Sequence, residues 1–133
     1  MAISPRDGRI ALTFIDEQAT PRRIRAAVIS PEGGPPIKVF EVPNIFGMIG
    51  PAPFAQVIEL TADGGAFTYL ETKAGVSNIW SQPVDGSPAK QLTNFKSDLI
   101  FFYSWSPDGK KLALARGKKI SDVVLIRDIT NAQ

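Results

Sequence analysis

The side chains that most often carry out enzyme chemistry are scarce in this sequence. It has no cysteine and no histidine, which excludes cysteine nucleophiles, thiolate zinc sites and the commonest general base. Acidic residues that a glycosidase could use are present, but no spacing pairs them as acid and base: Glu59, Glu71, Asp85 and Asp98. The serine-hydrolase phrase Gly-x-Ser-x-Gly does not occur, because residues 75–78 lack the closing glycine. We therefore predict a protein that is not an enzyme, with no catalytic residues and no cofactor.

Three of the four aspartates that precede a glycine lie in similar segments, and they are the next candidates for chemistry: Asp7, Asp63 and Asp108. A calcium loop needs several carboxylates at Asp-x-Asp-x-Asp spacing, which these segments do not provide. An aspartate that accepts backbone hydrogen bonds, followed by a glycine that tolerates positive φ, is typical of a tight β-turn. The sequence therefore predicts turns here and no metal site.

These turns belong to a repeated phrase, which places them at equivalent points of a repeated structural unit. Residues 4–12 (SPRDGRIAL) match residues 106–114 (SPDGKKLAL), and residues 61–69 (TADGGAFTY) form a weaker copy. The second and third Asp-Gly pairs lie 45 residues apart, close to the roughly 40 to 45 residues of a four-stranded propeller blade. The first and second pairs lie 56 residues apart, which predicts an inserted apolar connector at 43–54. A β-sandwich would also have many short strands, but it would not need one such phrase for every four strands.

Alternating apolar runs predict the strands of these units, and no stretch of ten or more residues shows helical periodicity. The predicted strands lie near residues 9–15, 24–29, 36–41, 56–60, 66–71, 78–83, 89–93, 99–105, 111–116 and 122–127. We predict an all-β fold with about three four-stranded β-propeller blades in a single region. Within residues 1–133, the blades are expected at 1–42, 55–94 and 98–130.

Two segments carry a resemblance to a known family. Residues 103–113 (YSWSPDGKKLA) resemble the recurring phrase of TolB-like (WD-repeat-like) β-propellers, and residues 78–93 resemble later strands of the same blade type. The sequence of residues 75–126 is also similar to the C-terminal propellers of bacterial serine/threonine kinases and winged-helix regulators, especially from Acidobacteria. This resemblance implies a non-catalytic module for protein or peptide interaction, in the sensor part of a larger signalling protein.

The sequence departs from the TolB-like pattern in its number of blades. TolB-like rings have six, and three are predicted here, which is half a ring. Either two chains pair as a homodimer to complete one ring, or the chain belongs to a longer protein. Two other functions stay open beside the interaction module. One is the gating propeller fragment of a prolyl-oligopeptidase-type hydrolase, and the other is a purely structural propeller that assembles with itself.

The overall charge and hydropathy point to no nucleic acid or membrane partner. The net charge is +2, too small an excess to indicate nucleic acid binding. No apolar run approaches the roughly 18 residues of a membrane span, and the first residues lack the apolar region of a signal peptide. We expect a soluble protein, and the choice between cytoplasm and periplasm stays open.

A candidate binding surface follows from propeller topology, in which two classes of loop share one face. On that face we expect residues 16–23, 43–54, 72–77, 94–98 and 116–121. They would bring cations around an apolar centre and suit an acidic peptide or protein: Arg22, Arg23, Phe46, Met48, Lys73, Lys96, Lys118 and Lys119. Aromatic residues inside the strands are predicted to pack in the core instead: Tyr69, Trp80, Phe101, Tyr103 and Trp105.

Overall fold

The computed structural model describes residues 1–42 and 58–119. In this part of the chain every regular element is a β-strand, which confirms the predicted all-β class. The strands are β1 (Ala2–Ile3), β2 (Ile10–Asp16), β3 (Arg23–Ile29), β4 (Lys38–Glu41), β5 (Ile58–Leu60), β6 (Ala66–Lys73), β7 (Val76–Pro83), β8 (Lys90–Gln91), β9 (Leu99–Trp105) and β10 (Leu112–Gly117). Among the described residues there is no helix that could span a lipid bilayer.

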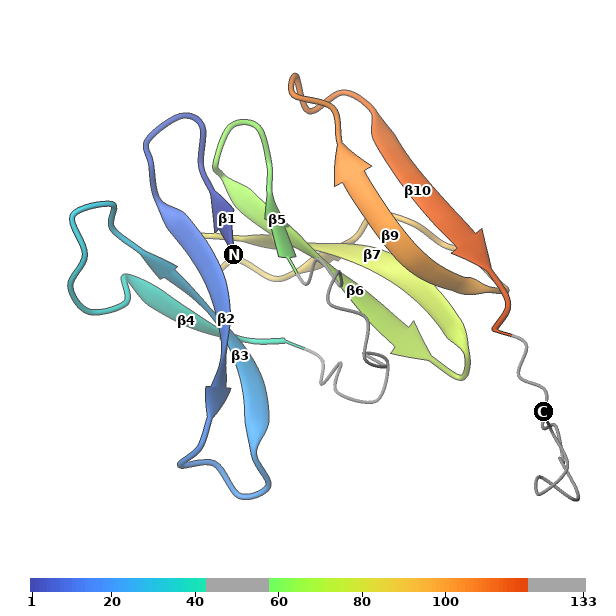
Figure 1. Cartoon of the computed structure of the whole chain (residues 1–133), viewed down its shortest axis with the longest axis horizontal. Coiled ribbons are helices and arrows are strands. Elements are labelled where there is room, and N and C mark those ends of the chain that lie inside the picture. The colour runs from blue at the N-terminus through green and yellow to red at the C-terminus, as the bar shows by residue number, and fades with distance from the viewer. Residues whose placement is uncertain (43–57, 120–133) are drawn as a thin grey trace, which may run out of the picture.

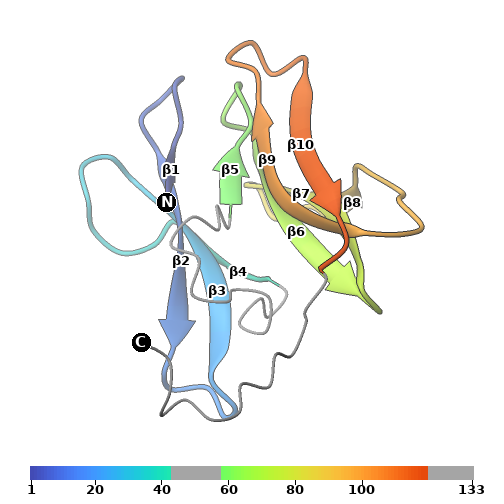
Figure 2. The ribbon, with the colours of Figure 1, turned by 45° about the vertical axis from the view of Figure 1, so that its right-hand side comes forward.

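The strands form three antiparallel sheets in which neighbours in sequence are neighbours in space. The first sheet has the order β1-β2-β3-β4, the second β5-β6-β7-β8, and the third pairs β9 with β10. The second sheet lies between the other two (Figures 1 and 2). The arrangement is propeller-like. Three predicted features lie outside the described residues: the strand at 122–127, the connector at 43–54 and residues 120–130 of the third blade. The number of blades and their boundaries therefore stay predictions.

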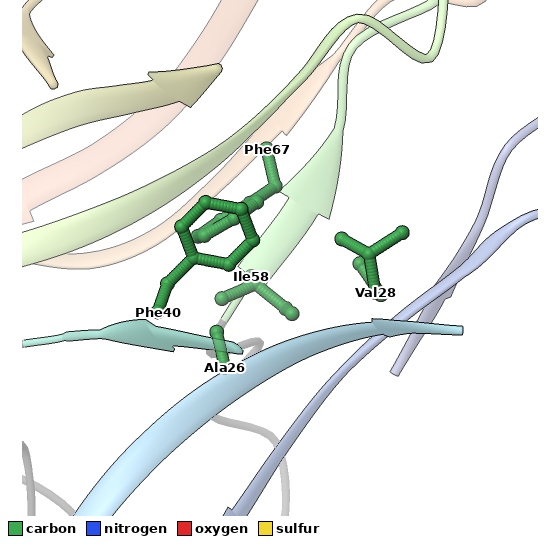
Figure 3. Close-up of a cluster of buried hydrophobic side chains, with 6 residues drawn as sticks. Ala26, Val28, Phe40, Ile58 and Phe67 are labelled. Atoms are coloured by element: carbon green, nitrogen blue, oxygen red, sulfur yellow. The ribbon is translucent and has the colours of Figure 1, made fainter. Parts of the chain in front are cut away.

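Apolar side chains fill the space between the first and second sheets (Figure 3). Small residues of β3 (Ala26, Val28) and Phe40 of β4 contact Ile58 of β5 and Phe67 of β6. The Phe40 and Phe67 rings meet edge to face, with centroids 5.1 Å apart and planes at 73°. Such a pair adds about 0.5–1.5 kcal/mol beyond the burial of its area, so this contact is a main link between the two sheets.

Buried hydrogen bonds reinforce the contact between the second and third sheets. Ile79 of β7 packs against Ile100 and Tyr103 of β9. The Tyr103 hydroxyl donates to the carbonyl of Thr68 over 2.8 Å, and Trp105 Nε1 donates to Thr68 Oγ1 over 3.2 Å. Burial raises the pKa of Tyr103 well above its ordinary value, so the phenol stays protonated and acts as a donor.

A bulge in β9 overturns one of the core predictions. Arg116 pairs with Ile100 and Ala115 pairs with Phe102, so Phe101 is an extra residue without a partner on β10. The bulge lets Ile100 and Tyr103 face the same core although they are three residues apart. Phe101 is 52% exposed, so the prediction that it packs in the core is wrong. The run of apolar residues in this strand does not show which of them face the core.

The Asp-Gly segments are turns, as predicted. Asp63 Oδ1 accepts hydrogen bonds from the Thr61 hydroxyl and the Gly65 amide. Asp108 is held in the same way by Ser106 and by the backbone of Lys110. These donors lower the pKa of both carboxyl groups. In the first turn, Asp7 forms an ion pair with the side chain of Arg9, which lowers the pKa of Asp7 to about 2.

The three turns lie at one end of the molecule (Figure 1). Arg9 Nη2 of the first turn donates to the carbonyl of Gly64 in the second over 3.2 Å. A Cβ atom on Gly109 of the third turn would come within 2.9 Å of the Ala62 methyl group. The repeated phrase therefore sits at the same level in successive sheets, and the β2–β3 and β6–β7 connections lie at the opposite end (Figure 1).

Candidate functional site

A pocket of about 290 Å³ opens on one face of the second sheet. Antiparallel register places its strand residues on that face, because Glu71 pairs with Asn78, Lys73 with Val76, and Trp80 with Gln91. The connection from β8 to β9 adds the remaining wall. The lining residues are Glu71, Lys73, Val76, Asn78, Trp80, Gln91, Phe95 and Lys96.

Opposite charges flank the ring of Trp80. Lys73 Nζ lies 2.9 Å from Glu71 Oε2 and 6.0 Å from the centroid of the Trp80 ring. The Lys73 side chain is 77% exposed, so the ion pair contributes little to stability, about 0–1 kcal/mol. Lys73 can therefore leave Glu71 for another anion with little change in the stability of the fold. The ammonium group is therefore free to move onto a bound anion, and the aromatic ring offers a stacking surface.

Asn78 fixes the loop that forms the pocket wall. Its Oδ1 accepts hydrogen bonds from the Phe95 amide over 2.7 Å and from the Thr93 hydroxyl over 3.0 Å, while its Nδ2 donates to the Phe95 carbonyl over 3.3 Å. The Arg116 guanidinium stacks 3.7 Å from the Phe95 ring centroid. Arg116 also donates to the Ser97 carbonyl over 2.9 Å. The loop is thus held from two sides, which presents Lys96 on a defined wall.

The structure separates the predicted binding residues into groups. Lys73 and Lys96 line the pocket. Four other cations are exposed but lie elsewhere: Arg22 and Arg23 at the β2–β3 connection, and Lys118 and Lys119 just beyond β10. Phe46 and Met48 lie outside the described residues.

Of the lining residues, sequence reasoning predicted only Lys73 and Lys96 as binding residues. Trp80 was expected in the core, but it is only partly buried and lines the pocket. The signal that could have found the lining residues of β6 and β7 is the two-residue turn at Ala74 and Gly75, both with positive φ. That turn fixes the register of β6 on β7 and so identifies the residues that share a face.

The lining is suited to noncovalent recognition. Its acidic residue, Glu71, is paired with Lys73, and Asn78 is engaged with the loop. Gln91 Nε2 donates to the Thr93 carbonyl over 2.6 Å, and Lys96 Nζ donates to Asn94 Oδ1 over 2.8 Å. A ligand would therefore meet the Trp80 ring and two ammonium groups that would exchange a partner within the protein for the ligand. An aromatic surface with a few convergent polar groups is what small binding pockets commonly offer.

A second pocket, of about 210 Å³, lies where β1, β5 and β9 meet near the Asp-Gly turns. The buried Glu59 forms part of it, and its Oε2 accepts a hydrogen bond from the Trp105 amide over 3.1 Å. The predicted binding cations are not among its lining residues: Ala2, Ile3, Pro5, Glu59, Leu60, Ala62, Trp105, Ser106 and Pro107. We therefore take the Trp80 pocket as the candidate site.

Comparison with known proteins gives one partial similarity. No protein-family model matches the chain, and no solved structure matches it. A segment of 56 residues, 42% of the chain, is 34% identical to a protein named Tricorn protease homolog 1 from Streptomyces coelicolor. The matched segment corresponds to 5% of the length of that protein.

Proposed function

We propose that this chain is a non-catalytic, TolB-like propeller module that binds peptides or proteins through the Trp80 pocket. The observation that carries the proposal is the pocket itself, which combines an aromatic surface with two of the predicted cations, Lys73 and Lys96. An extended acidic peptide with an aromatic side chain would complement it, since the ring could stack on Trp80 while carboxylates pair with the lysines. A sensor role within a signalling protein is the context in which such binding would be used.

Charge reversal of matched lysine pairs tests this proposal. The probe is a labelled peptide that alternates glutamate with phenylalanine and tyrosine, and the readout is fluorescence anisotropy. Lys73→Glu with Lys96→Glu should weaken binding roughly tenfold or more, because two ion pairs become repulsions. Lys118→Glu with Lys119→Glu changes the net charge equally outside the pocket and should leave the affinity within about twofold at moderate salt. Equal losses in both pairs would show general charge attraction and contradict the pocket.

Trp80→Ala provides a test that does not depend on charge. Loss of a stacking aromatic residue at the centre of a binding site costs roughly 1–3 kcal/mol of affinity, so the dissociation constant should rise by about tenfold or more. Trp105→Phe is the matched control, because the Trp105 indole nitrogen is bonded inside the protein to Thr68.

A second candidate is a propeller segment of a peptidase, in which the same pocket would handle peptide substrates or products. The similarity to Tricorn protease homolog 1 favours it. The test is to treat the native protein that contains this chain with a fluorophosphonate probe for activated serines. Labelling of that protein, with none of the isolated 133-residue chain, would support this candidate. A native protein that consists of this chain alone and is not labelled would exclude it.

A further inference from the structure

The hydrogen bonds of the three turns define equivalent positions in the three sheets. In each turn a backbone N–H donates to the carbonyl five residues on, from Ser4 to Arg9, Thr61 to Ala66 and Ser106 to Lys111. The first residue after each acceptor is therefore equivalent in the three sheets, and so is the second. The first set is Ile10, Phe67 and Leu112, and the second set is Ala11, Thr68 and Ala113.

Both sets of equivalent positions are covered where two sheets meet. On the face toward the preceding sheet, Phe67 of the second sheet is fully buried and Leu112 of the third is partly buried. On the face toward the following sheet, Ala11 of the first sheet and Thr68 of the second are 1% and 0% exposed. Each interface between successive sheets therefore joins one face of each kind.

The outward faces at the two ends carry these same positions. In the described part of the chain, no sheet covers the outer face of the first sheet, which carries Ile10 and Leu12 with the more exposed Ile3 (60%) and Phe14 (38%). The outer face of the third sheet carries Ala113, which is exposed although its counterparts are buried, and Phe102, which is 46% exposed. The two outward faces are therefore the two halves of the interface that the chain already forms twice.

From this equivalence we infer that the outer face of the first sheet docks on the outer face of the third sheet of a second copy of the chain. Each copy offers one face of each kind, so two copies related by a two-fold axis cover all four faces. Burial of an apolar sheet face of this kind is the usual driving force for such an association. The docking faces are separate from the Trp80 pocket, so this inference stands apart from the proposed function.

Paired charged variants test the head-to-tail contact. Wild-type protein should have twice the chain mass of 14.4 kDa by light scattering during gel filtration. Leu12→Asp, on the outer face of the first sheet, and Ala113→Arg, on the outer face of the third, should each be monomeric. An equimolar mixture of the two variants should recover the dimer, because one interface is then unaltered and the other joins opposite charges. Leu92→Asp, at a residue 45% exposed beyond β8, is the control and should stay dimeric.

Circular dichroism must show that each variant is folded. If Leu12→Asp unfolds, the more exposed Ile3→Asp replaces it. A monomeric wild type, a wild-type mass above two chains, dimers of either single variant, or a mixture that stays monomeric would each overturn the inference.

Discussion

At the scale of single residues, the repeated aspartates are structural groups with chemical consequences for stability. The donors around Asp63 and Asp108 lower the pKa of both carboxyl groups from 3.8, and Arg9 lowers that of Asp7 to about 2. Such a group stabilises the fold fully above the pKa of the unfolded chain, and this contribution is lost as the pH falls through the folded pKa. We predict that the free energy of unfolding decreases between about pH 5 and about pH 2, measured by urea unfolding.

Substitution of one turn shows whether the carboxylates cause this decrease. Asp108→Asn keeps an acceptor in the turn but cannot titrate, so its loss of stability with falling pH should be smaller than that of the wild type. Ser106→Ala removes the strongest cause of the lowered pKa of Asp108 and should reduce the slope in the same direction. Identical slopes in wild type and both variants would show that the acid sensitivity arises elsewhere.

At the scale of the elements, the bulge of β9 decides which aromatic and aliphatic side chains stabilise the protein. Ile100 is 2% exposed and Phe101 is 52% exposed. Ile100→Ala should therefore destabilise the fold by about 2–4 kcal/mol, as for other buried aliphatic residues. Phe101→Ser should change stability by less than about 1 kcal/mol, although it removes the larger side chain. Chemical denaturation of both variants measures the difference, and a larger loss for Phe101→Ser would mean that β9 pairs without the bulge.

The same scale shows how far sequence reasoning reaches. Period-two alternation and Asp-Gly turns depend on local preferences, and they placed the described strands β2 to β10 within about two residues of their observed positions. The β9 bulge escaped because residues 99–105 (LIFFYSW) are nearly all apolar, so an inserted residue leaves no break in a polar–apolar alternation. The lysines of the pocket were singled out by loop position, but Trp80 was not, because its exposure depends on how much of one face the neighbouring sheet covers.

At the scale of the whole molecule, the sheets behave as stacked units joined by a few large side chains. In such repeat architectures, stability is approximately the sum of the units and of the interfaces between neighbours. The edge-to-face pair of Phe40 and Phe67 joins the first two sheets, and both rings are buried. Phe40→Ala and Phe67→Ala should each cost about 3–5 kcal/mol. In the double variant the combined loss should be smaller than the sum, by about 0.5–1.5 kcal/mol.

A double-mutant cycle from urea unfolding measures the coupling energy between Phe40 and Phe67. Phe40 lies in β4, the last strand of the first sheet, and Phe67 lies in β6 of the second, so a coupling energy between them reports on the sheet-to-sheet interface itself. Phe40→Ala with Ile100→Ala is the matched pair, because Ile100 contacts the other interface, and their effects should add within about 0.5 kcal/mol. If Phe40 couples equally to Ile100 and Phe67, the sheets unfold as one continuous core and the description as stacked units fails.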